Sequence, residues 1–161
     1  MSNHTVLRGL IAPAAVLAVL VGSAATAQAP APIKLERLRV QLIYETTGTL
    51  SPDITPPADF SLWNTIIGEG SAAEPASDIL VGVELSTTDE QANATVPLKV
   101  VVRGEGGKVL ATRTFDGVFM DKGRVVRSLL VPNATCAGPV VIEASFGTQK
   151  LRTPMDFACG E

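Results

Sequence analysis

The chain has 161 residues, the size of one ordinary domain, and carries a formal net charge of −3. Hydrophobic residues make up 46% of it, aromatic residues 4% and charged residues 18%. This balance excludes a largely disordered chain, which would contain few apolar residues, and a nucleic-acid-binding protein, which would carry a basic excess.

Residues 1–27 have the pattern of a secretory signal peptide. Arg8 supplies a basic start, an apolar run extends from Leu10 to Val21, and Ala25-x-Ala27 offers a small-residue cleavage site. The apolar run is shorter than the roughly 20 residues that cross a membrane as a helix. We therefore expect cleavage and a soluble product, periplasmic or secreted, with no stable membrane insertion.

Cleavage would also remove His4, the only histidine of the chain. The mature protein would then have no imidazole general base, no histidine-activated nucleophile and no histidine metal ligand. The sequence therefore predicts a protein that is not an enzyme, with no catalytic residue, no cofactor and no metal site.

The remaining chain has the periodicity of one all-β domain. We expect a flexible segment over 28–34 and a single β-sandwich domain over 35–161. Runs rich in Val, Ile and Thr alternate between apolar and polar residues and are separated by Gly and Pro, which is typical of strands. The strands are expected near 35–46, 79–87, 96–103, 108–115, 124–131, 140–146 and 150–158, with 118–120 as an extension of the fourth.

Seven such strands, with no helical crossovers between the later ones, predict an antiparallel β-sandwich. In strand count and alternation the pattern resembles immunoglobulin-like bacterial envelope domains. The resemblance implies an immunoglobulin-like arrangement of the two sheets.

A connection over 46–78 separates the first two strands and is too long for an ordinary loop. We expect a short helix or an irregular insertion near 58–68. A helix would place Phe60, Trp63 and Ile67 on one face. An extended chain is the alternative, because apolar residues also alternate from Phe60 onward.

Two roles are open for the single tryptophan, Trp63. It either covers one end of the core as a lid or contacts a partner, since aromatic residues anchor binding sites. The candidate partner-binding residues of this segment are Phe60, Leu62, Trp63, Ile66 and Ile67.

The last two strands form a predicted hairpin around Gly147-Thr148, because glycine suits the first central position of a type II′ turn. This turn pairs Glu143 with Arg152 on one face. The opposite face is apolar, and by parity the two cysteines belong to it. Its residues are Val140, Ile142, Ala144, Phe146, Leu151, Met155 and Phe157.

The same register sets Cys136 opposite Cys159, at a separation that a disulfide accepts. We therefore predict a structural disulfide that closes the hairpin of an exported protein. A redox or metal-binding pair is the less favoured alternative, because there is no C-x-x-C motif. Pro154 lacks an N–H group and predicts a sheet edge or a bulge in the last strand.

Together these features predict an exported, non-enzymatic β-sandwich that binds another envelope macromolecule as an adaptor, an assembly factor or a chaperone-like module. Its partner is expected to be a periplasmic or cell-surface protein, bound at a sheet edge or through the 58–68 segment. One alternative is a small carboxylate-based hydrolase acting on envelope polysaccharide, although the acids select no pair by their spacing. The other is a purely structural surface protein.

Overall fold

A computed structural model of the chain describes residues 32–160. The predicted signal peptide over 1–27 lies outside these residues. Among the helices of the described part, none has the length and apolar character to cross a membrane.

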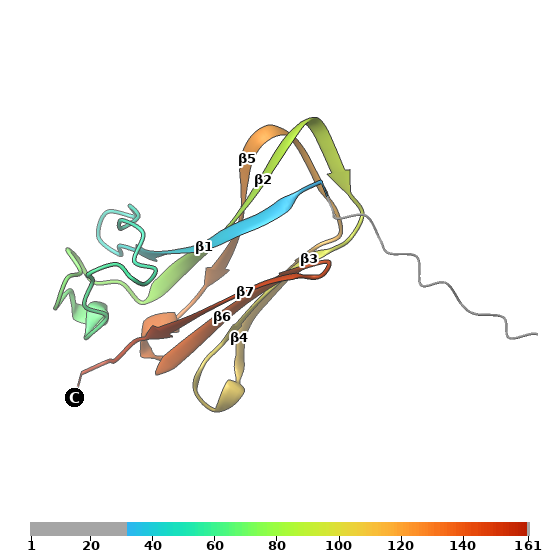
Figure 1. The fold of residues 1–161 in the computed structure, drawn as a ribbon. Coiled ribbons are helices and arrows are strands. Elements are labelled where there is room, and N and C mark those ends of the chain that lie inside the picture. The colour runs from blue at the N-terminus through green and yellow to red at the C-terminus, as the bar shows by residue number, and fades with distance from the viewer. Residues whose placement is uncertain (1–31, 161) are drawn as a thin grey trace, which may run out of the picture.

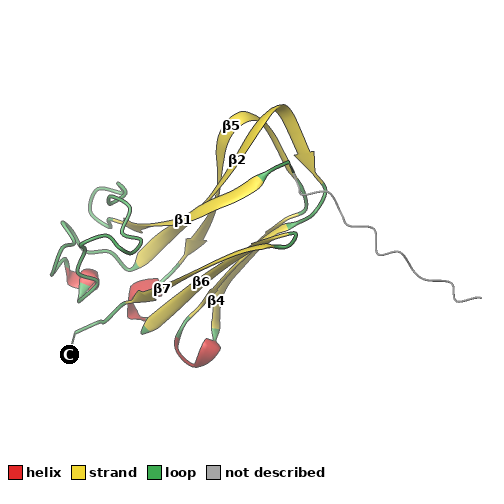
Figure 2. Cartoon of the chain, viewed as in Figure 1, coloured by secondary structure: helices red, strands yellow, loops and turns green. Residues whose placement is uncertain are grey.

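All seven predicted strands are present (Figures 1 and 2). Three short 3-10 helices lie in the connections between them: η1 (Thr65–Ile67), η2 (Glu105–Gly107) and η3 (Ala134–Cys136). The strands are β1 (Lys34–Ile43), β2 (Asp78–Ala94), β3 (Leu98–Arg103), β4 (Val109–Phe115), β5 (Val118–Val131), β6 (Pro139–Phe146) and β7 (Gln149–Asp156).

The strands form two antiparallel sheets, in the orders β1-β2-β5 and β4-β3-β6-β7. The predicted all-β sandwich is therefore confirmed. In the constant-type immunoglobulin arrangement the fourth strand belongs to the sheet of the first, second and fifth. Here β4 pairs with β3 instead, and it lies beside β5 across the open side of the sandwich.

The core lies between the two sheets and consists of every second residue of the strands. In the three-stranded sheet, for example, Val81 on β2 pairs with Val40 on β1 and Leu129 on β5, and all three are buried. Phe146 and Phe157 are the largest fully buried side chains and fill the side of the four-stranded sheet.

The N-terminal boundary of the domain differs slightly from the prediction. Ile33 is fully buried and Lys34 begins β1, so these two residues belong to the sandwich and not to a flexible segment.

β2 and β5 are longer than expected, and Figure 1 shows them curling together over one end of the sandwich. Residues 118–120 begin β5, so the prediction that they extend the fourth strand is wrong. Their partners are residues 92–94 at the end of β2, after an irregularity between Thr87 and Gln91. This curled part closes the core, because its inward-facing side chains are buried: Ala92, Ala94, Val118 and Met120.

The register of the last hairpin is confirmed, with Phe146 opposite Gln149 and Glu143 opposite Arg152. Gly147 has a φ of 58°, which a type II′ turn requires at its first central position. The Nε atom of Arg152 lies 3.7 Å from a carboxylate oxygen of Glu143. β7 is an edge strand, as Pro154 predicts.

Candidate partner-binding end

Residues 44–77, which we call the insert, connect β1 to β2 and lie at the same end of the sandwich as the C-terminus (Figure 1). The first part of the insert runs antiparallel to the outer edge of β1. The N–H of Ser51 donates to the carbonyl of Leu42 (3.0 Å), and the N–H of Ile54 donates to the carbonyl of Val40 (2.8 Å). Ile54 itself is buried. This part of the insert therefore extends the sandwich beyond its first strand.

The second part of the insert is extended and not helical. Only residues 65–67 form a 3-10 turn, so the predicted helical face of Phe60, Trp63 and Ile67 is not formed. Phe60 and Leu62 pack against the core, whereas Trp63 faces outward. The alternation of an extended chain, the second prediction, accounts for this arrangement.

The C-terminal segment holds the backbone of Trp63 in place. Trp63 forms a parallel bridge with Ala158, whose carbonyl accepts a hydrogen bond from the N–H of Asn64 (2.6 Å). In return, the N–H of Ala158 donates to the carbonyl of Leu62 (3.3 Å). Two segments that are distant in sequence thus support each other.

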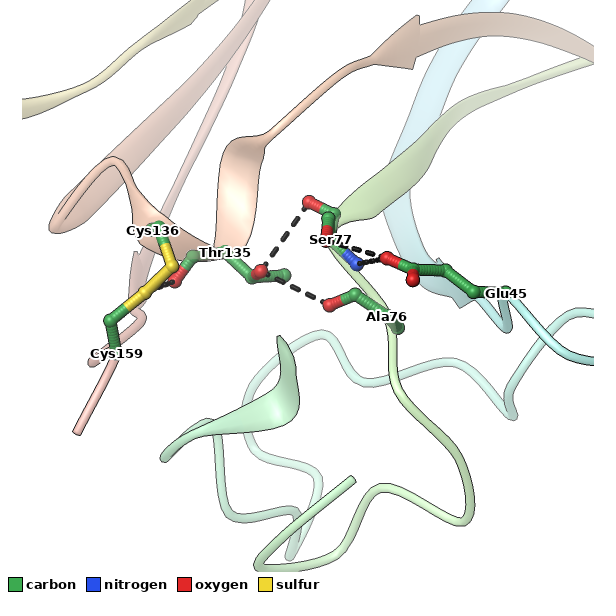
Figure 3. Close-up of a disulfide and its surroundings, with 6 residues drawn as sticks. All are labelled: Glu45, Ala76, Ser77, Thr135, Cys136 and Cys159. Carbon is green, nitrogen blue, oxygen red and sulfur yellow. Dashed lines mark hydrogen bonds between the residues drawn. A yellow bond between two sulfur atoms is a disulfide. The ribbon is translucent and has the colours of Figure 1, made fainter. Parts of the chain in front are cut away.

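The disulfide lies next to this contact, because Cys159 directly follows Ala158 in the chain; Figure 3 shows the bridge. It joins Cys136 to Cys159 with their Cα atoms 5.2 Å apart. The ladder of β6 and β7 ends at Pro139 and Asp156, so the bridge lies beyond it and Cys136 is exposed at the end of η3. The expectation that both cysteines share the buried apolar face is therefore wrong for Cys136.

Thr135, next to the disulfide, ties the last part of the insert to η3. Figure 3 shows that its hydroxyl donates to the carbonyls of Ala76 (3.1 Å) and Ser77 (3.3 Å). Its N–H also donates to the carbonyl of Ser77 (3.3 Å). The Ser77 hydroxyl in turn donates to the carboxylate of Glu45 (2.6 Å). The insert is therefore an ordered element with contacts at several points along its length.

Among the five candidate partner-binding residues, two are well exposed. Ile67 is 57% exposed and Trp63 is 50% exposed. Ile66 is half-buried, and Phe60 and Leu62 are partly covered by the core that they pack against. We call the surface around Trp63 and Ile67, together with residues 157–160, the Trp63 end.

The Trp63 end carries negative charge. The sequence has no lysine or arginine between Arg39 and Lys99. Sequence reasoning missed this signal, although the long acidic stretch is visible in the printed chain. Five carboxylates on or next to the insert form no salt bridge within the described residues. They are Glu45, Asp59, Glu69, Glu74 and Asp78.

Two of the four edge strands, β1 and β7, are protected against pairing with another strand. The insert covers β1. On β7, Pro154 occupies a non-hydrogen-bonded position opposite Val141, counted from the turn, so its missing N–H faces the free edge. The Gln149 amide links both strands, since it accepts from the N–H of Leu35 (2.8 Å) and donates to the carbonyl of Ile33 (3.0 Å).

The other two edges, β4 and β5, are protected by arginines. Arg113 and Arg127 pair with the buried residues Val100 and Val83, so both occupy core-facing positions at an edge. The Arg113 guanidinium stacks over Phe115, 4.5 Å from the ring centre, and donates to a backbone carbonyl of β5 (2.8 Å). Inward-pointing charges are a known way to block edge pairing.

A buried carboxylate on the outer face of the three-stranded sheet organises a group of arginines. Glu84 accepts two hydrogen bonds from the guanidinium of Arg37, at 2.9 and 3.0 Å. These hydrogen bonds, with the charges of Arg37, Arg39 and Arg124, lower the pKa of Glu84 against the opposing effect of burial. This group was not among the sequence-based predictions, although an acid between the buried Val83 and Leu85 marks it.

Asp53 extends this group into the insert. Burial alone would raise the pKa of Asp53. The Thr55 hydroxyl (2.6 Å), the N–H groups of Val40 and Thr55 and the charge of Arg37 outweigh burial, so its pKa is lowered. The Asp53 carboxylate thereby ties the insert to β1.

A carboxylate-based hydrolase needs a raised pKa on one of two facing carboxyls. Glu84 and Asp53 have lowered pKa values instead. Glu90 and Asp121 line an open hollow of about 590 Å³ at the curled end. There the Nζ atom of Lys122 lies 2.7 Å from a carboxylate oxygen of Glu90. Over residues 32–160, no group of three or more His, Cys, Asp and Glu side chains is arranged to hold a metal ion.

Comparison with known proteins finds no matching family model and no matching curated protein. Among solved structures, a β-glucuronidase from Bifidobacterium dentium complexed with coumarin-3-O-glucuronide is similar at a TM-score of 0.39 and 12% identity, over 80% of this chain and 19% of that one. The C-terminal domain of wzt is similar at a TM-score of 0.37 and 14% identity, over 79% and 68%. This chain therefore spans about a fifth of the length of the glucuronidase.

Proposed function

We propose that this protein is an exported, non-enzymatic β-sandwich that binds another envelope macromolecule through its Trp63 end. The observation that carries the proposal is the exposure of Trp63 and Ile67 on an insert that is otherwise held by hydrogen bonds and packing. Large apolar side chains on a preorganised surface are typical anchors of protein interfaces, because little conformational freedom is lost on binding.

The protected sheet edges support this choice between the two binding modes expected from the sequence. Strand addition needs an edge with free N–H and C=O groups. Here the insert, Pro154 and two inward arginines obstruct the four edges. Docking at the Trp63 end needs no such edge and is therefore the mode that we propose.

Export is supported by the disulfide, since such bonds persist in oxidising compartments. A binding role rather than catalysis is supported by the arginine partners of Glu84 and Asp53, which favour ionised carboxylates. We infer that the protein acts as an adaptor or assembly factor for a periplasmic or cell-surface protein.

The test is a matched pair of substitutions. Ile67 and Phe119 are almost equally exposed, at 57% and 58%, but Phe119 lies near the start of β5, far along that strand from the insert. We expect Ile67→Asp to reduce co-purification of a discrete envelope protein by at least tenfold, since interface anchors contribute about 2 kcal/mol or more. Phe119→Asp should retain it. Equal retention by both variants would contradict the proposal.

A further inference from the structure

The outer face of the four-stranded sheet concentrates positive charge in a chain that is acidic overall. Lys99 and Arg103 on β3 and Lys150 and Arg152 on β7 alternate with core-facing residues and therefore point outward. Glu143 is the acid among them. We call these four cations and their surroundings the basic face.

The cations of the basic face are only partly neutralised. Arg103 and Arg152 share the single carboxylate of Glu143, at 3.5 and 3.7 Å. Ser145 pairs with Lys99 on one side and with Lys150 on the other, so two lysines flank it in one row. In the part of the chain that the structure describes, neither lysine forms a salt bridge.

The remaining outward positions make the basic face flat and free of aromatic side chains. They hold small polar or aliphatic residues, which offer no ring on which a sugar would stack. Neighbouring strands are about 4.8 Å apart, so the cations are spread over a plane and do not converge on one small anion. The other outward residues around the cations include Val101, Val109, Thr112, Thr114, Val141 and Ser145, and Asp156 lies farther along β7.

We propose that the basic face binds the anionic surface of a lipid membrane. A planar set of cations is complementary to a plane of negatively charged headgroups, and each lysine or arginine near such a surface contributes about fivefold to binding. The contact is peripheral, because the apolar side chains that the face exposes are short valines, Val109 among them, and none is aromatic. Screening by salt should therefore reverse it.

Binding of the basic face to a membrane is compatible with the proposed function but does not depend on it. Along β7 the outward charge changes from Lys150 and Arg152 to Asp156, which lies at the end of the ladder nearest the disulfide. The acidic Trp63 end follows that position. A membrane that attracts the basic face would therefore repel the Trp63 end and leave it accessible.

The experiment measures co-sedimentation of the protein with vesicles of phosphatidylcholine, with and without phosphatidylglycerol. Binding to pure phosphatidylcholine vesicles measures any contact that does not depend on lipid charge, and this amount is subtracted. We expect additional binding to the anionic vesicles at low salt and its loss at 1 M salt, where the screening length is about 3 Å.

Two double variants with the same change of net charge locate the contact. K99E/K150E lowers the charge of the basic face by four units. It should weaken anionic-vesicle binding several hundredfold, at about fivefold per unit of charge. K34E/K122E places the same change elsewhere on the surface and should retain most of the binding. Thermal melts establish that both variants fold.

Three outcomes would overturn the proposal: equal binding to neutral and anionic vesicles, equal losses in the two double variants, or binding of soluble polyphosphate without binding of anionic vesicles. None of these outcomes affects the Trp63 end, whose test uses Ile67→Asp.

Discussion

The Trp63 side chain is half exposed and does not belong to the core. Its neighbour Leu62 packs inward, and the extended backbone then turns the indole outward. The backbone of Trp63 pairs with Ala158, so the position of Trp63 is fixed although half of its side chain is exposed. A lid over the core would instead be buried, as Phe157 is.

The stability of Trp63→Ala distinguishes these roles. Because half of the side chain is already exposed, we expect a loss of about 2 kcal/mol in the free energy of unfolding. Phe146→Ala, at a fully buried position, should lose about 3–5 kcal/mol. Urea denaturation measures both values. A loss for Trp63→Ala as large as that for Phe146→Ala would identify Trp63 as a lid.

Glu84 makes the stability of the protein sensitive to acid. Its pKa is lowered in the folded state, so it stabilises the fold above its unfolded pKa, and this contribution is lost as the pH falls through the lower folded value. At pH 7 we expect Glu84→Gln to cost about 1.5–3 kcal/mol, because the hydrogen bonds from Arg37 lose their charged acceptor.

The comparison of wild type and Glu84→Gln by urea denaturation at several pH values checks this assignment. The two proteins should converge in stability as the pH falls from the ordinary range of a glutamate pKa through the lower pKa that Glu84 has in the folded protein. A difference that is constant from pH 7 to pH 3 would show that ionisation of Glu84 does not stabilise the fold.

At the scale of elements, the last hairpin and the insert differ in how far the sequence determines them. The hairpin register follows from Gly147 and from residues a few positions apart, so it was predictable. The insert takes its conformation from β1, from Thr135 and from Ala158. Its periodicity therefore left both a helix and an extended chain open, and contacts distant in sequence decide between them.

The extension of β2 was missed for a related reason. Residues 88–91 are polar and carry no strand-like apolar alternation, yet they continue β2. They do so because β2 pairs with β5 at either end of this stretch, Thr87 with Gly123 and Gln91 with Asp121. The edge position of β7, by contrast, followed from the chemistry of one residue, Pro154.

The disulfide connects the C-terminal segment to η3 and, through Thr135, to the insert. Replacing both cysteines by serine should cost about 3 kcal/mol, because the bridge restricts a loop with a sequence separation of 23. Hydrogen exchange should also accelerate at Asn64 and Ala158, whose N–H groups join the insert to this segment. Unchanged exchange at both positions would show that the bridge does not support the Trp63 end.

At the scale of the whole molecule, the surface has distinct regions with different chemistry. The insert is acidic and exposes Trp63 and Ile67, whereas the outer face of the four-stranded sheet is basic. The edge strands of both sheets are obstructed. This division of the surface fits the two proposed contacts, one through the Trp63 end and one through the basic face, and obstructed edges disfavour pairing strand to strand.

The most direct test of the Trp63 end is photo-crosslinking in intact cells from position 67. A photoreactive residue at position 67 should yield one discrete crosslinked envelope protein, and the same residue at position 119, which is equally exposed, should not. The absence of a specific product from position 67, or the same product from both positions, would contradict the account.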